Sequence, residues 1–158
     1  MCKKIIFISI GLIITDQTIK KIMLNKQIEI IKNIFYLEYL QNNGIVFGIK
    51  MNNCLVIFLS ILIILIFIKI INKYKYLTNS ISLIFAGSIS NTIDRIIRGY
   101  VVDYIKIFEL PIFNLADVFI IIGVLIFWKK FIFEIINKNK ENDNNNNSKE
   151  YRRWNNEK

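Results

Sequence analysis

The chain has 158 residues, enough for one domain, and 54% of them are hydrophobic, which exceeds the usual share in a soluble domain and indicates a membrane protein. The net charge of +9 comes from Lys and Arg residues that flank apolar blocks, a placement typical of membrane boundaries and not of a nucleic-acid-binding protein. His is absent, which excludes a Ser-His-Asp triad, a Cys-His pair and a His-ligated metal site.

Four apolar blocks predict four transmembrane helices, at residues 5–23, 55–71, 77–97 and 115–136. They approach the roughly 20 residues that cross a hydrocarbon core of about 30 Å. The first and third blocks contain acids, bases and amides, which are costly against lipid. We therefore expect these polar side chains to face a protected interior.

The connecting segments differ from the helices in composition. Residues 24–53 hold short β-branched and aromatic runs and an Asn-Asn-Gly turn signal, which predicts a small β-rich cradle between the first two helices. Residues 98–114 form the other long connection. Residues 137–158 are rich in Asn, Lys and Glu, so we expect a disordered tail.

The distribution of basic residues predicts the orientation. More Lys and Arg lie on the side that holds both termini, so we expect the termini and the tail in the cytoplasm and segments 24–53 and 98–114 outside it. The predicted fold is an all-α membrane protein, a four-transmembrane-helix bundle with an extracytoplasmic cradle. Residues 1–136 make up its single domain.

Charged residues of the first and third predicted helices fall at helical spacings. Asp16 and Lys20 are four residues apart, which fits either a structural ion pair or direct contact with a substrate. On the third helix five residues share an arc of roughly 100° and are expected to point into the bundle. They are Gly87, Asn91, Asp94, Arg95 and Arg98.

Two further acids flank the only proline. Taken singly, Asp103 fits a solvated loop acid, and Asp117 fits a helix cap three residues after the N-cap residue Asn114. Taken together, they are returned to one membrane face by a hairpin. Two carboxyl groups held close share one proton, so that one activates a water while the other donates to a carbonyl. The pair therefore predicts peptide hydrolysis with no metal and no cofactor, and the two cysteines, Cys2 and Cys54, lack metal-type spacing.

Four ordered segments resemble the lipoprotein signal peptidase family, also called signal peptidase II or aspartic peptidase family A8. Asp16–Lys20 is similar to its D-x-x-x-K element, and NNGIVFG at Asn42–Gly48 to its N-x-G-x-x-F element. GSISNTIDRIIRGYVVDYI at Gly87–Ile105 and FNLAD at Phe113–Asp117 complete the resemblance.

The resemblance implies an enzyme of the bacterial cytoplasmic membrane that removes signal peptides from prolipoproteins, cutting before a diacylglyceryl-modified cysteine. Its expected partners are lipid-modified precursors and membrane lipids, without nucleic acid, and we expect a monomer. The catalytic aspartates fall on Asp103 and Asp117, and Asp16 and Lys20 match polar positions of the first helix. Positions that hold the pair or contact substrate fall on Asn42, Gly87, Asn91, Asp94, Arg95, Asn114 and Ala116.

Two non-catalytic alternatives stay open on the residues alone. A small bundle could conduct ions or protons along Asp16, Asp94 and Arg95, and an assembly subunit could chaperone apolar helices. The first explains the buried charges but not two acids at one membrane face. The second predicts that amides at both acid positions leave function intact.

Overall fold

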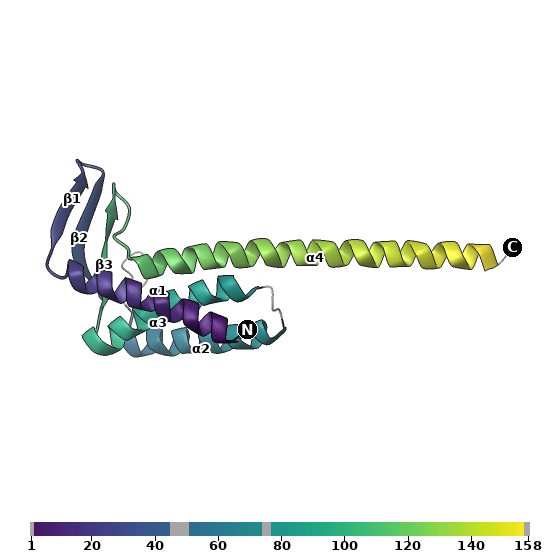
Figure 1. Cartoon of the computed structure of the whole chain (residues 1–158), viewed down its shortest axis with the longest axis horizontal. Helices are drawn as coiled ribbons and strands as arrows, with labels where there is room; N and C mark the ends of the chain where they lie inside the picture. Colours follow the sequence, from purple (N-terminus) through teal and green to yellow (C-terminus); the bar gives the residue numbers. More distant parts are fainter. Residues whose placement is uncertain (1, 45–50, 74–76, 157–158) are drawn as a thin grey trace.

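A computed structural model describes residues 2–44, 51–73 and 77–156, with side chains at 3–44, 51–70 and 77–140. Within these residues the chain forms four helices and one small sheet at their end (Figure 1). In chain order the elements are α1 (Cys2–Met23), β1 (Gln27–Ile31), β2 (Phe35–Asn42), α2 (Asn53–Lys73), α3 (Thr78–Arg98), β3 (Val101–Ile107) and α4 (Leu115–Asn156).

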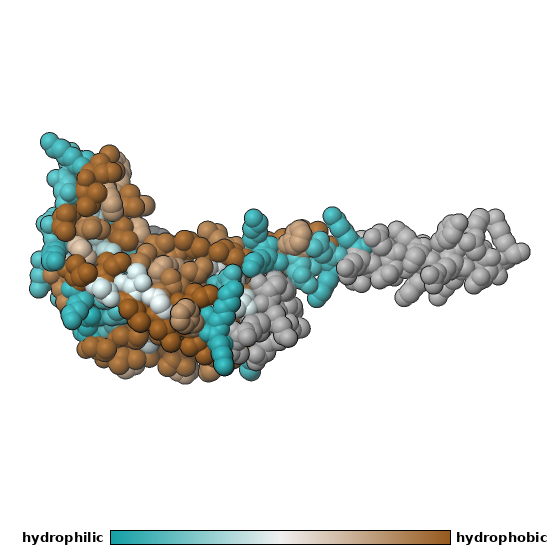
Figure 2. All heavy atoms as spheres, in the orientation of Figure 1, coloured by the Kyte–Doolittle hydropathy of each residue, from teal (hydrophilic) through white to brown (hydrophobic). Residues whose placement is uncertain are grey.

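The four predicted helices are present, and the starts of all four, with the ends of α1, α2 and α3, lie within one turn of the predicted bounds. The chain is mostly helical with a three-stranded antiparallel sheet, which confirms the fold prediction at that level. Among the described residues, one stretch, Asn53–Ile70 in α2, is long and apolar enough to cross a membrane. The other helices contain charged residues within their apolar stretches. Figure 2 shows that the helical body is largely hydrophobic on the side in view.

Helix α4 differs from the prediction at its end. The sequence predicted a helix to residue 136 and disorder beyond it, whereas the backbone stays helical to Asn156 and projects past the other helices (Figure 1). The physical reason is the absence of helix breakers, because no Gly or Pro follows Gly123.

Helix α3 lies at the centre and packs against α1, α2 and α4. Its buried positions are mostly small or polar, and this allows neighbouring backbones to come close. At Gly87 a Cβ atom would overlap the carbonyl oxygen of Ala116, and at Gly123 it would lie 2.8 Å from the carbonyl oxygen of Ser80. These contacts hold the first three turns of α4 against the N-terminal half of α3.

The sheet has the strand order β1-β2-β3, so the segment after α3 supplies its third strand. Gly99 ends α3 in the left-handed region with a φ of 81°, which lets the chain turn directly into β3. Asp103 of β3 pairs with Leu40 of β2. The loop after β3 folds back, since Ile105 and Phe113 exchange backbone hydrogen bonds of 2.8 and 3.0 Å. The end of β2, the middle of β3 and the start of α4 therefore converge.

Candidate functional site

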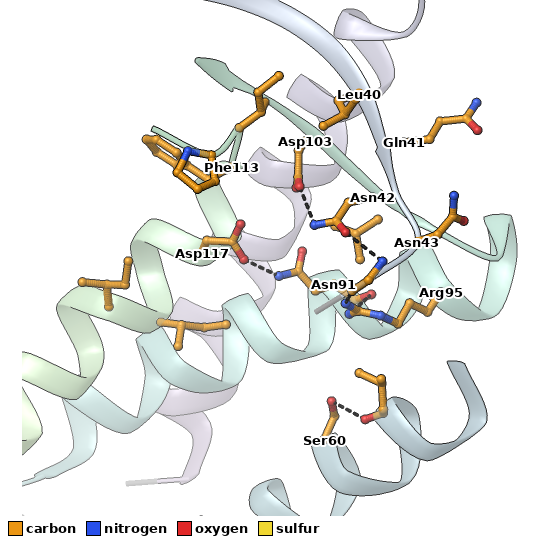
Figure 3. Close-up of a pocket in the computed structure, with 17 residues that line it drawn as sticks. Leu40, Gln41, Asn42, Asn43, Ser60, Asn91, Arg95, Asp103, Phe113 and Asp117 are labelled. Atoms are coloured by element: carbon orange, nitrogen blue, oxygen red, sulfur yellow. Dashed lines mark hydrogen bonds between the residues drawn. The ribbon is translucent and has the colours of Figure 1, made fainter. Parts of the chain in front are cut away.

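A cavity of about 860 Å³ opens where the sheet meets α2, α3 and α4 (Figure 3). Asp103 comes from β3 and Asp117 from the first turn of α4, and both line this cavity. The walls are mainly apolar, with amide and hydroxyl groups at a few places. The lining residues on the strands are Leu40, Gln41, Asn42 and Val101, and those on helices α2, α3 and α4 are Val56, Ser60, Asn91, Arg95, Ile120 and Ile121.

Asp103 is held by amide groups on both of its oxygens. Its Oδ1 accepts a hydrogen bond of 2.6 Å from Asn114 Nδ2, and its Oδ2 accepts one of 2.8 Å from Asn42 Nδ2. The residue is 1% exposed, although it sits on a strand beside a cavity. The interpretation of Asp103 as a solvated loop acid is therefore excluded.

Asp117 and Asn114 cap the start of α4 reciprocally. Asn114 Oδ1 accepts the Asp117 backbone N–H at 3.0 Å, and Asp117 Oδ2 accepts the Asn114 backbone N–H at 3.2 Å. The other oxygen of Asp117 accepts a hydrogen bond of 2.8 Å from Asn91 Nδ2 (Figure 3). Asp117 thus caps the helix, and it also faces the cavity.

Asn114 links the two acids. Among the described residues no hydrogen bond joins the carboxyl groups of Asp103 and Asp117 directly, but Asn114 bonds to both residues and is fully buried. Its Nδ2 also donates to Asn91 Oδ1 at 3.2 Å. The acids are consequently held on one rigid frame of amides, open to the cavity.

The environment of Asp103 changes its acidity. Burial, and secondly the negative charge of Asp117, raise the pKa of Asp103 to about 6, against the opposing effect of hydrogen bonds from Asn42 and Asn114. A raised pKa means that the folded chain holds this proton more tightly than the unfolded chain. The protonated carboxyl group of Asp103 therefore adds to the free energy of unfolding. This stabilisation is fully present below the usual pKa of 3.8 and is lost as pH rises through about 6.

Replacing Asp117 by Asn is expected to lower the pKa of Asp103, because the second cause of its shift disappears while burial remains. Infrared difference spectra against the Asp103→Asn chain isolate the protonated carboxyl band of Asp103. The band is expected to titrate with a midpoint of about 6 in the unaltered chain and at lower pH in Asp117→Asn. A midpoint near 3.8 in the unaltered chain, or no change on substitution, would contradict this account.

Arg95 reaches the same cavity from α3 (Figure 3). Its Nη2 donates to the carbonyl oxygen of Gly44 at 3.1 Å, which ties α3 to the end of the β2 segment. Asn42 Oδ1 accepts the Gly44 backbone N–H at 2.9 Å. Residues 45–48 of the NNGIVFG motif lie outside the described residues.

A second polar cluster lies behind the cavity, with Lys20 at its centre. Lys20 Nζ lies 2.8 Å from Asp16 Oδ2, 2.9 Å from Asp94 Oδ2 and 2.9 Å from Asn91 Oδ1. All four residues are buried, and the three charged ones are fully so. Because a Lys has three donors and no acceptor, the Asn91 oxygen must face Lys20, and this turns the Asn91 NH₂ group toward Asp117.

Further bonds of this cluster join four elements of the fold. Asp16 Oδ1 accepts the Ala116 backbone N–H at 3.0 Å, and Asp94 Oδ2 accepts the Val102 backbone N–H at 3.2 Å. Asp94 also pairs with Arg98. The cluster therefore fixes the starts of α4 and β3 relative to α1 and α3.

The predicted site residues fall into two groups. Asn42, Asn91, Arg95, Asp103 and Asp117 line the cavity. The others lie behind it, where Gly87 packs on Ala116, Asn114 connects the acids, and Asp94 pairs with Lys20. Sequence reasoning did not assign Ser60, Ser90 or Gln17 to the site. Ser60 could have been found from the sequence, because it is the single hydroxyl residue of an apolar helix. The Oγ of Ser90 donates a hydrogen bond of 2.6 Å to Asp16 Oδ2.

Among the described residues, no group of three or more Cys, Asp or Glu side chains could hold a metal ion. The arrangement supplies two carboxyl groups, amide donors and one guanidinium. Such a set is suited to acid-base chemistry on a polar bond in a largely apolar cavity.

The family model described as Signal peptidase (SPase) II matches residues 8–133. The chain belongs to the signal peptidase II family. A lipoprotein signal peptidase of Halothermothrix orenii is 38% identical over 132 residues, which cover 75% of this chain and 90% of that protein. One of Clostridium tetani is 37% identical over 137 residues, covering 78% of this chain and 88% of that protein.

A solved bacterial membrane enzyme, determined by the in meso method at 2.3 Å resolution, has the same fold. It superposes with a TM-score of 0.80 at 29% identity, over 86% of this chain and 92% of that one. Signal peptidase II is a bacterial membrane enzyme and an aspartic peptidase, so the predicted family, enzyme class and membrane association are confirmed. Membership of this family favours neither of the two non-catalytic alternatives, the conduction of ions or protons and the chaperoning of apolar helices.

Proposed function

We propose that the chain removes signal peptides from prolipoproteins, cutting before the diacylglyceryl-modified cysteine, with Asp103 and Asp117 as the catalytic pair. The observation that carries this proposal is that both acids face one cavity and are bonded to the same buried residue, Asn114. Family membership supplies the reaction class, since the relatives are named lipoprotein signal peptidases.

Two carboxyl groups are sufficient for the reaction. We assign the resting proton to Asp103, in keeping with its raised pKa, and the role of base to Asp117, whose carboxyl group accepts hydrogen bonds from Asn91 and Asn114. Asp117 takes a proton from a water whose oxygen attacks the scissile carbonyl carbon, while Asp103 donates its proton to the carbonyl oxygen. When the intermediate collapses, the C–N bond breaks, Asp117 gives its proton to the leaving amine, and the carbonyl reforms as Asp103 regains its own.

Four other residues hold substrate and acids in place. Asn91 and Asn114 orient the two carboxyl groups through the hydrogen bonds described above. Arg95 and Asn42 have polar groups at the cavity wall and hold backbone carbonyls of the substrate. General acid-base catalysis of this kind contributes about 10² to 10⁴ in rate.

The substrate enters sideways between α2 and α4. Val56 and Ser60 of α2 and Ile120 and Ile121 of α4 line the cavity, and both helices pack on α3. An apolar signal helix fits such a cavity. The lipidated cysteine of the substrate stays anchored in the bilayer. The position of Asp103 and Asp117 along the membrane normal therefore determines which peptide bond is cut.

All four helices cross the membrane, with both termini in the cytoplasm and the sheet and cavity on the outer side. The buried pairing of Asp16, Lys20 and Asp94 supports this layout, because it removes the charges of α1 and α3 from contact with lipid. Residues 1–136 form the peptidase domain, and α4 continues beyond it into the cytoplasm. The proposed working state of the enzyme is a monomer.

The test is incubation of the purified full-length chain with a synthetic precursor peptide whose cysteine has the diacylglyceryl group. Mass spectrometry of the products is expected to show one cut, directly before that cysteine. The matched control is the same peptide with an unmodified cysteine, which is expected to remain intact. Equal cleavage of both peptides, or a cut at another bond, would reject the proposed specificity.

A further inference from the structure

A second, shallower groove lies between α1 and α3 and shares no residue with the cavity of the two acids. It is lined by Ile14, Gln17, Thr18, Lys21, Ile22 and Arg98. Lys21 and Arg98 lie in the last turns of α1 and α3, at the helix ends that lead into the sheet. The cationic part of the groove is therefore at the boundary of the helical body.

The two cations of this groove have unused donors. Lys21 is exposed, and within the described part of the chain its ammonium group forms no ion pair. Arg98 donates from Nη1 to Asp94 and to Gln17 Oε1, and its side chain is 22% exposed. A guanidinium has five N–H groups, so Arg98 keeps donors for an anion at the groove surface.

The other residues that line the groove are two isoleucines, Ile14 and Ile22, and two uncharged polar residues, Gln17 and Thr18. Ile14 and Ile22 are 59% and 54% exposed. Ile14 lies seven residues before Lys21, which places it about 10 Å deeper along the helix axis. An occupant with a charged head at Lys21 and an apolar tail along Ile14 matches both parts of the groove.

We propose that this groove binds one anionic phospholipid of the phosphatidylglycerol class. The phosphate lies between Lys21 and Arg98, and an acyl chain runs along α1 past Ile14. Charge favours a lipid of net charge −1 over a zwitterionic one, whose choline would be repelled by the same two cations. A soluble anion would leave the exposed side chains of Ile14 and Ile22 without a partner. The site is independent of the cleavage reaction proposed above.

The test is a lipid competition measured by native mass spectrometry of the full-length chain in detergent. Dioleoyl phosphatidylglycerol and dioleoyl phosphatidylcholine are added in equal amounts, and the singly bound species are compared. The unaltered chain is expected to retain phosphatidylglycerol about tenfold more than phosphatidylcholine, and Lys21→Gln is expected to remove most of that preference. Lys21 is exposed, so its loss does not disturb folding.

The matched control is Lys32→Gln, which removes one exposed charge from the β1–β2 turn on the same side of the bundle. It is expected to keep the full preference. Arg98→Gln is expected to act like Lys21→Gln, and the result for Lys21→Gln stands if the Arg98 variant fails to fold. Equal retention of the two lipids by the unaltered chain, or an equal effect of Lys21→Gln and Lys32→Gln, would overturn the proposal.

Discussion

Turnover of a lipidated precursor is expected to fall about 10³-fold or more when either Asp103 or Asp117 is replaced by Asn, because each substitution removes one of the two groups that exchange protons with the substrate. Asn has nearly the same volume as Asp and can still accept one of the existing hydrogen bonds. The new amide oxygen in Asp103→Asn would accept from Asn114 Nδ2, and the one in Asp117→Asn would accept from Asn91 Nδ2. The fold should therefore survive, and thermal unfolding in detergent checks that it does.

The matched control is Glu109→Gln, an equivalent change at an exposed acid in the loop between β3 and α4. Its turnover is expected to equal that of the unaltered chain. Product formation is followed by chromatography under single-turnover conditions, so that slow product release does not mask the chemical step. Full turnover in Asp103→Asn or Asp117→Asn would end the proposal of an aspartate pair.

Replacing Lys20 by Met is expected to destabilise the bundle by about 3 to 5 kcal/mol, the usual cost of removing one partner from a buried ion pair. Lys20 is fully buried between Asp16 and Asp94, so its loss leaves excess negative charge inside the bundle. Asn91 would also lose the donor that orients its amide toward Asp117. The unfolding temperature and the turnover of the precursor should both decline.

A charge-balanced variant separates these two effects. In Asp16→Asn/Lys20→Met the excess charge is removed, and the new amide oxygen at position 16 still accepts the Ala116 backbone N–H. Most of the stability is expected to return, while turnover stays low because Asn91 remains without its ammonium partner. Lys20→Met with the unfolding temperature of the unaltered chain would contradict the first expectation, and full turnover of the double variant would contradict the second.

Much of the fold follows from sequence features that are compatible with few other structures. Long apolar blocks without Gly-Pro turns predicted the helices, and Asn114 before an apolar run predicted the start of α4 at Leu115. The return of Asp103 and Asp117 to one place followed from the short connection between them. The end of α4 was not predicted, because a polar composition alone does not distinguish a solvated helix from a disordered tail.

The side chains of α3 show why spacing alone gives only part of a site. Asn91 and Asp94 point inward, as their shared face predicted. Arg95 and Arg98 belong to the same arc, yet Arg95 lines the cavity of the two acids while Arg98 lines the groove beside α1. Long side chains reach the edges of a helix face, and what they reach depends on neighbouring helices. The contribution of α2 to the cavity wall depends on tertiary packing in the same way.

The pairing of charges in α1 and α3 bears on how the chain is made. Asp16 and Lys20 form an ion pair within α1, and Asp94 and Arg98 form one within α3. In the proposed four-span layout, Asp16 and Asp94 each have a counter-ion within their own helix before the partner helix has been synthesised. The contact between Lys20 and Asp94 forms only when the two helices meet, so in this layout neither acid enters the lipid without a paired cation.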